Sequence, residues 1–562
     1  MTDLPAGPSP DAPAWPLRPW LLAALLGFAG LLEHLVTRGG TTPGQTALAV
    51  LVAVSALTLA LTLEPVRLVW ALVFAAVASL VLAGIAWHLD IGHAGNSHAD
   101  YAFASGVVAL LIAVPLFQAA QHAGSRRIFY PRVHFHVWND IVTVGAALLF
   151  TGLAWLLLWL MVALFQLIEL NFLDRLVRQS WFGWTISGVA FGAALGILRE
   201  NEAIIATLQR VVMLVLTVLA LPLALGLSVF LAALVVSGPE VLWHATRSAT
   251  PVLMACIVGA FVLINAVIRD TDAEASSNRA LRIAALALAL TLLPLALFAA
   301  VSTGLRIGQY GLSPDRMWAL TVVIVGCAYG LAYLVAVVRG RSGWASLARI
   351  ANLRLAIGVS VIAAILALPL IDFGSIAARD QLARLASGRV TTAKFDWRGL
   401  RWDFGPAGRR VLERIASSGT AEQRPLAKAA LVQSSRHEDS PLPENPEALD
   451  RNLDASALDP VQRAPLLTFL RTRWEACQGH CVALDGGVIA GGAPGGARRI
   501  VLVDKGSTWL LQFDPARATV IDAPDVAPTI HAPLLPKDRV ELRPVTRQQV
   551  YVNGQPVGEP LR

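Results

Sequence analysis

The fold of this chain is decided by residues 354–387, which read RLAIGVSVIAAILALPLIDFGSIAARDQLARLAS. The part up to Ile371 is apolar and close to the length of about 20 residues that a helix needs to cross a membrane. After Asp372, charged residues alternate with apolar ones at helical spacing, which is typical of an amphipathic helix in water. Asp372 therefore marks the predicted end of a membrane region.

Ten further apolar runs precede this one. The eleven runs together are 20–37, 45–63, 67–88, 101–120, 140–168, 182–198, 210–236, 250–268, 282–303, 317–338 and 354–371. They predict an all-α polytopic membrane bundle of about eleven transmembrane helices over residues 17–371. The run at 182–198 is short and rich in glycine, so the helix count depends most on it. Residues 1–16 hold five prolines and no Lys or Arg, which predicts a disordered leader.

The composition agrees with a membrane protein. Of the 562 residues, 56% are hydrophobic and only 15% are charged, whereas soluble domains average about 25% charged residues. The formal net charge of +7 is not concentrated in one patch. We therefore predict the lipid bilayer as a partner and no nucleic acid.

Arginine predicts the orientation, because short cytoplasmic loops carry an excess of basic residues. With the N-terminus in the cytoplasm, 14 arginines of the membrane region and its loops fall inside and 6 fall outside. Eleven crossings then place the C-terminal region outside. The expected location is a bacterial inner membrane, with the tail in the periplasm.

The tail divides into two predicted parts. Residues 372–480 have the periodicity of amphipathic helices and form an extracytoplasmic helical region. Residues 481–562 are expected to form a small β-rich domain, because 499–503, 508–513 and 518–521 are short β-type runs. Asn553-Gly554 with apolar flanks is a typical hairpin turn. The tail is therefore predicted to be α+β.

Two cysteines in the tail are a candidate disulfide. Cys477 and Cys481 are separated by three residues, and in an oxidising compartment they could close a short loop. A redox-active pair, a metal site with His480 and two unpaired thiols remain open alternatives. Of these alternatives, the metal site lacks a fourth ligand nearby, so our prediction for this chain includes no metal.

Three polar residues lie within apolar runs and are candidate functional residues. They are Glu33, His34 and Asn265. Ionisable and strongly polar groups are costly in a membrane and often functional. The alternative is that each lies close enough to an interface to reach water.

The loop GLRIGQYGLSPDR at residues 304–316 is the most distinctive predicted outer loop. Its candidate patch consists of Arg306, Gln309, Tyr310, Asp315 and Arg316. One interpretation is a capped helix start, with Ser313 as the N-cap and Pro314 in the first turn. The other is a polar surface that meets a substrate or the tail. We expect Arg306, Tyr310 and Arg316 to lie near residues 394–404.

Residues 394–410 read KFDWRGLRWDFGPAGRR and alternate aromatic with charged side chains. Trp397 and Trp402 together with the neighbouring basic residues suit the headgroup layer of a membrane. We therefore expect an amphipathic segment that docks on the membrane surface.

Familiar catalytic motifs are missing from the sequence. It contains no phosphate-binding Gly-rich loop with Lys-Ser/Thr, no His-Glu-x-x-His and no Gly-x-Ser-x-Gly. We predict no catalytic residue and no cofactor, and leave enzymatic activity open.

Three strings together resemble a known family. They are LRENE at 198–202, RIGQYGLSPDR at 306–316, and the pairs Phe395-Asp396 and Phe404-Gly405. Trp138-Asn139 before the run 140–168 adds to the likeness. The strings resemble the DUF4153 family of bacterial polytopic membrane proteins of unknown function, over about residues 100–415. The resemblance implies a bacterial membrane location and brings no catalytic residues.

Three functions follow from these features. The favoured one is a non-enzymatic envelope scaffold or sensor with an extracytoplasmic C-terminal binding domain. The alternatives are a transporter or channel-like protein, and a membrane-embedded transferase that acts on a lipid-linked substrate. Envelope proteins and lipid or cell-wall components remain open as partners.

Overall fold

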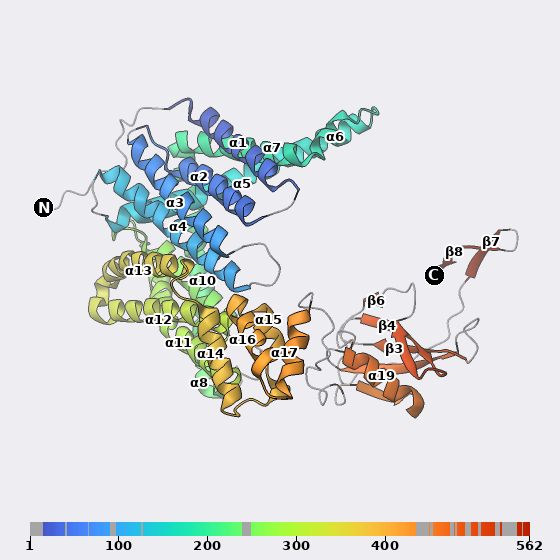
Figure 1. The fold of residues 1–562 in the computed structure, drawn as a ribbon. Coiled ribbons are helices and arrows are strands. Elements are labelled where there is room, and N and C mark those ends of the chain that lie inside the picture. Colours follow the sequence, from blue (N-terminus) through green and yellow to red (C-terminus); the bar gives the residue numbers. More distant parts are fainter. Residues whose placement is uncertain are drawn as a thin grey trace. The chain divides into compact units, whose positions relative to one another are not determined.

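The chain forms two compact units, Met1–Leu431 and Val432–Arg562 (Figure 1). The computed structural model describes residues 15–39, 42–65, 67–89, 97–124, 128–238, 249–433, 449, 453–472, 477, 480–488, 496–503, 507–522, 529–530, 548–552 and 555–561. Most of the predicted leader, 1–16, lies outside these residues. The predicted fold class is confirmed: a helical membrane bundle is followed by a region with a small mixed sheet.

The membrane part of the first unit is entirely helical in its described elements. They are α1 (Arg18–Thr37), α2 (Pro43–Thr62), α3 (Leu68–Leu89), α4 (Ser97–Ala123), α5 (Tyr130–Gln166), α6 (Phe172–Val177), α7 (Ser180–Glu200), α8 (Glu202–Ser237), α10 (Thr250–Ile268), α11 (Arg279–Tyr310), α12 (Pro314–Gly340), η1 (Arg341–Gly343) and α13 (Trp344–Ala367).

In the described part of the chain, ten helical stretches are long and apolar enough to cross a membrane. The last of them, Pro314–Ala367, contains both α12 and α13, which pack against each other. Each of the eleven predicted apolar runs therefore lies on a helix. The protein is a multi-pass membrane protein.

The Gly-rich run 182–198 forms α7, which packs closely along α1. Three glycines spaced four residues apart, Gly188, Gly192 and Gly196, lie on the face of α7 that meets α1. A Cβ at Gly192 would overlap the carbonyl oxygen of Leu22. Small residues at this spacing let two membrane helices approach until their backbones touch. The glycines that made this helix uncertain in the sequence therefore allow its close packing on α1.

The centre of the bundle is an apolar cluster between α8, α10, α11 and α12. Leu288, Leu292 and Leu295 of α11 have no exposed surface. Small residues such as Ala289 and Ala296 lie beside them and let the neighbouring helices pack closely. The middle of α11 is therefore sealed by side chains.

The two longest described helices far exceed the thickness of the hydrocarbon core. α5 has 37 residues and α8 has 36, which at 1.5 Å per residue is about 55 Å, against a hydrocarbon core of ~30 Å. Unless they tilt strongly, their ends extend into the headgroup layer or beyond.

After Asp372 the chain forms a small group of helices that still belongs to the first unit. They are α14 (Phe373–Ala386), η2 (Thr392–Lys394), α15 (Trp397–Trp402), α16 (Gly405–Ser418) and α17 (Gln423–Val432). Asp372 caps α14 by accepting a hydrogen bond from the Ser375 N–H, 3.1 Å. In Figure 1, α14 to α17 lie together, and α14 contacts both α12 and α16.

The aromatic segment at 394–404 is part of the core of this helical group. Trp397 is 2% exposed and Trp402 is 5% exposed, and Leu400 and Leu412 are fully buried beside them. The expectation that these tryptophans face a membrane surface was wrong, because they fill the space between α15 and its neighbours instead.

The described part of the second unit contains a mixed sheet packed with the helix α19 (Pro460–Thr472). The strands are β1 (Leu453–Ala457), β2 (Cys481–Val488), β3 (Arg498–Val503), β4 (Ser507–Asp514), β5 (Thr519–Asp522), β6 (Thr529–Ile530), β7 (Gln548–Val552) and β8 (Gln555–Leu561). The sheet order is β1-β2-β3-β4-β5, with β6 also on β4. β1 is parallel to β2 and the other pairs are antiparallel.

The core of this unit lies on one face of the sheet. Ile500 and Leu502 of β3, Leu511 of β4 and Leu466 of α19 have no exposed surface. Ile500 and Leu502 are two residues apart, as expected for side chains on the same face of a strand. β7 and β8 pair separately with each other, and the predicted turn Asn553-Gly554 between them lies outside the described residues.

Candidate functional site

The predicted outer loop is held in place by α14. Gln381 donates hydrogen bonds from Nε2 to the carbonyl oxygens of Tyr310, 3.0 Å, and Leu312, 2.7 Å. Asp380 accepts a hydrogen bond from the Leu312 N–H, 2.7 Å. The turn between α11 and α12 therefore has backbone donors and acceptors that are satisfied by side chains of α14. We call these contacts the α14 clamp.

Arg384 completes the α14 clamp on the last turn of α11. Its Nη2 donates to the carbonyl oxygens of Gln309, 2.9 Å, and Gly308, 3.3 Å. These carbonyls lie in the last turn of α11, where a helix has free acceptors and a partial negative charge. The guanidinium thus satisfies the end of α11 and stabilises its dipole.

Arg316 is the residue of the predicted patch with the most contacts. Its Nη1 donates to the Gly311 carbonyl oxygen, 2.8 Å, and its guanidinium lies 5.4 Å from the ring centroid of Tyr310. Asp396 lies close enough to interact with it electrostatically. The expected proximity of Arg316 to residues 394–404 is thus seen, although most of the contacts to the loop come from α14.

The remaining residues of the patch have different surroundings. Ser313 caps α12 by accepting a hydrogen bond from the Arg316 N–H, 3.3 Å. The side chains of Gln309, Tyr310 and Asp315 are exposed, and Arg306 is half-buried. The capped helix start and the polar surface are therefore both present in this loop.

A second polar cluster joins α1, α2 and α7, and the sequence patterns did not predict it. Arg18 binds Glu64 at 2.8 Å and Glu200 at 3.1 Å, and Arg199 binds the other carboxylate oxygen of Glu64 at 2.7 Å. Arg199 also donates to the carbonyl oxygens of Ala60 and Leu63 at the end of α2. We call this the Arg199 cluster.

Further polar side chains lie on α4 and α5. Gln118 donates to Asp140 at 3.2 Å, and the rings of His122 and His136 stack with 3.0 Å between nitrogens. His134 instead accepts a hydrogen bond from Trp138 Nε1, 3.1 Å. His134 and His136 thus have different partners, and the described residues contain no group of three or more metal-ligating side chains.

Asn265 lies in a buried hydrogen-bond network at one end of the bundle. Its Oδ1 accepts from Asn352 at 2.7 Å and from Tyr130 at 3.2 Å, and its Nδ2 donates to Tyr333 at 3.0 Å. The network ties α10 to α5, α12 and α13. Buried hydrogen bonds of this kind fix the packing of their helices, although the Oδ1 atom of Asn352 has no partner among the described residues.

Glu33 and His34 lie near the end of α1, and the structure does not bring them to Asn265. Both are half-buried. The Oε1 atom of Glu33 is buried without a hydrogen-bond partner among the described residues. The three candidate intramembrane residues therefore belong to different environments.

The family can now be stated from the sequence match. The model of the DUF4153 family, a domain of unknown function, matches residues 46–415. The chain belongs to the DUF4153 family. No match is found among curated proteins or among solved structures.

The DUF4153 match covers the α14 clamp and most of the Arg199 cluster. It begins near residue 46, earlier than the expected start at about residue 100, so α2 and Glu64 belong to it. Arg199 and Glu200 come from the string 198–202, and Arg316 and Asp396 come from the other two strings. The strings that resembled the family therefore supply the polar contacts between distant helices.

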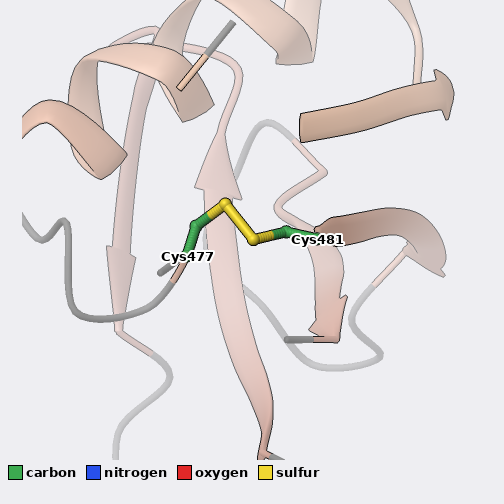
Figure 2. The surroundings of a disulfide bond; sticks show 2 residues. All are labelled: Cys477 and Cys481. Atoms are coloured by element: carbon green, nitrogen blue, oxygen red, sulfur yellow. A yellow bond between two sulfur atoms is a disulfide. The ribbon is translucent and has the colours of Figure 1, made fainter. Parts of the chain in front are cut away.

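The second unit of this DUF4153 protein lies beyond the match. Cys477 and Cys481 form a disulfide there, at the start of β2 (Figure 2). Both cysteines are buried in the core between the sheet and α19. Cys256 and Cys327 are free, half-buried cysteines of the membrane helices.

Proposed function

We propose that this protein is a scaffold or sensor of the bacterial envelope, anchored in the inner membrane, whose second unit binds a partner outside the cytoplasm. The observation that carries the proposal is the α14 clamp. Asp380, Gln381 and Arg384 attach the helices that follow Asp372 to the turn between α11 and α12. A change in the helices after Asp372 would therefore be transmitted to the membrane bundle.

The apolar centre of the bundle supports a scaffold over a transporter. Transport sites lie near the middle of the membrane and are built from broken helices and polar groups. Here Leu288, Leu292 and Leu295 fill the centre of α11. The Asn265 network and the Arg199 cluster lie instead towards helix ends.

Arginine distribution and the disulfide support the proposed orientation. The Arg199 cluster joins three helix ends, and the arginines at these ends are all predicted to lie on the cytoplasmic side. Arg306 and Arg316, in contrast, are predicted to lie outside. A disulfide in the second unit suits an oxidising compartment such as the periplasm.

The edge of the sheet is the proposed binding surface of the second unit. In the described part of the chain, β5 pairs only with β4, and its Ile521 is exposed. A strand at the edge of a sheet can accept an added strand from a partner through backbone hydrogen bonds. Envelope proteins are the proposed partners, with lipid or cell-wall components as the alternative.

A photo-crosslinking experiment tests this proposal. A photoreactive amino acid replaces Ile521 in the full chain in intact cells, and the control position is the exposed Leu214 of α8. We expect protein or cell-wall adducts from position 521 and only lipid adducts from position 214. Adducts that are the same from both positions would contradict the proposal.

One observation favours a transferase as the second candidate. Asp100 and Asp315 both lie within electrostatic range of Tyr101 on the predicted outer side. Two carboxylates at one site are typical of acid–base chemistry. If this site is catalytic, the Asp100→Asn and Asp315→Asn variants should each fail to restore the wild-type phenotype to a strain that lacks the gene. A scaffold should tolerate both changes.

A further inference from the structure

A pocket of about 270 Å³ lies at the end of the bundle where α5 and α8 begin and α10 ends. Its lining includes Phe135, Gln209, Arg210, Met213, Arg269 and Asp270. The residues from α8 are spaced three and four apart, so they share one face of that helix. α5 and α8 are longer than the hydrocarbon core is thick, so polar residues near their starts suit the level of the lipid headgroups.

The polar wall of this pocket is held rigidly. Arg269 has a positive φ of 50°, which is uncommon for a residue with a side chain and marks a constrained position. Buried Arg349 donates to the carbonyl oxygens of Ile268, 2.6 Å, and Arg269, 3.0 Å. The loop that carries Asp270 is therefore fixed before any ligand binds.

The charges of the pocket suit a zwitterion. Arg269 pairs with Glu274 at 3.4 Å. Arg210 and Asp270 have no ion-pair partner within 4.0 Å among the described residues. One cation on α8 and one anion on the loop after α10 thus line the same pocket, with the apolar side chains of Phe135 and Met213 beside them.

We propose that this pocket binds the phosphoethanolamine headgroup of a membrane phospholipid. The phosphate is bound by Arg210, and the primary ammonium donates hydrogen bonds to Asp270. The glycerol and the start of an acyl chain lie along Phe135 and Met213. An anionic headgroup without an amine would leave Asp270 unpaired, and a choline headgroup has no N–H to donate.

Lipid retention by the full-length protein tests this assignment. The protein is reconstituted with equal amounts of phosphatidylethanolamine, phosphatidylglycerol and phosphatidylcholine, purified in mild detergent, and its bound lipids are quantified by mass spectrometry. We expect phosphatidylethanolamine to be enriched several-fold. Arg210→Gln should reduce its retention about tenfold, and Asp270→Asn should remove the preference over phosphatidylcholine.

The matched control is Arg339→Gln, an exposed arginine at the end of α12, which should leave retention unchanged. Equal retention of the three lipids, or equal effects of Arg210→Gln and Arg339→Gln, would overturn the proposal. If soluble phosphoethanolamine at equal concentration displaces the lipid, the ligand is the free headgroup and not a membrane lipid, which would contradict the proposal. Monodisperse elution of each variant shows that it is folded.

Discussion

Gln381 lies directly over Gly311. Its Nε2 atom is 2.7 Å from the place where a Cβ of Gly311 would be, and it donates to the carbonyl oxygens on both sides of that glycine. Gly311 itself has a φ of +77°, which favours glycine. The closeness of α14 and the conformation of the turn therefore both require glycine at 311.

Gly311→Ala should loosen the α14 clamp. We expect it to lower the free energy of unfolding by about 1–3 kcal/mol, because it adds backbone strain and displaces Gln381. Gly308→Ala is the matched control, since a Cβ there meets nothing within 4 Å and alanine favours the helix. Thermal unfolding in detergent measures both, and equal melting temperatures of the two variants would contradict the α14 clamp.

The glycines of α7 predict a second pair of variants. Gly192→Ala should push α7 away from α1, because a Cβ there would overlap the Leu22 carbonyl oxygen. A loss of about 1–3 kcal/mol is expected for such overpacking. Gly226→Ala in α8, where a Cβ meets open space, should be neutral or stabilising. A Gly192→Ala variant as stable as the wild type would show that α1 and α7 are not in backbone contact.

The Arg199 cluster predicts non-additive effects. Arg199→Gln should destabilise the protein by about 3–5 kcal/mol, because it leaves Glu64 without one of its two arginines in a mostly buried place. Adding Glu64→Gln to that variant should lower the free energy of unfolding by less than Glu64→Gln does in the wild type. A double-mutant cycle by thermal unfolding measures the coupling, and strictly additive costs would exclude a direct ion pair.

Acid should weaken the contact between Arg349 and Asp272. The hydrogen bond from Arg349 holds the pKa of Asp272 below its ordinary value of 3.8. A lowered pKa in the folded state means that this stabilisation is present above about pH 4 and is lost as the pH falls through the folded value. Asp272 is 70% exposed, so solvent screens the pair and the effect should stay below ~1 kcal/mol.

The measurement is the difference in melting temperature between the wild type and Asp272→Asn from pH 7 down to pH 3. The wild type should be slightly more stable at pH 7, and the two should converge in acid. A difference that grows as the pH falls would have the wrong sign for this pair.

The membrane helices were predictable because their signal is local. Each apolar run needs only its own residues to be seen, and the run 182–198 formed a helix even though its glycines made it uncertain. The strands of the second unit were likewise visible as short β-type runs. Local patterns therefore predicted most of the elements.

The polar contacts were less predictable because they join distant parts of the chain. Glu64 and Arg199 are 135 residues apart, and a single charged residue at the end of an apolar helix does not by itself indicate a partner. Trp397 looked like a headgroup residue from its charged neighbours, but its burial depends on how α15 packs with α16. The sequence patterns singled out the loop 304–316 and the helix start that follows it, but they did not predict its partner α14.

Topology is the most direct test of the central claim that the region after Asp372 lies outside the cytoplasm. Alkaline phosphatase fused after Arg562 should be active in intact cells, because this enzyme folds only in an oxidising compartment. A green fluorescent protein at the same position should stay dark. A fluorescent fusion together with an inactive phosphatase would place the second unit in the cytoplasm and contradict the proposed envelope function.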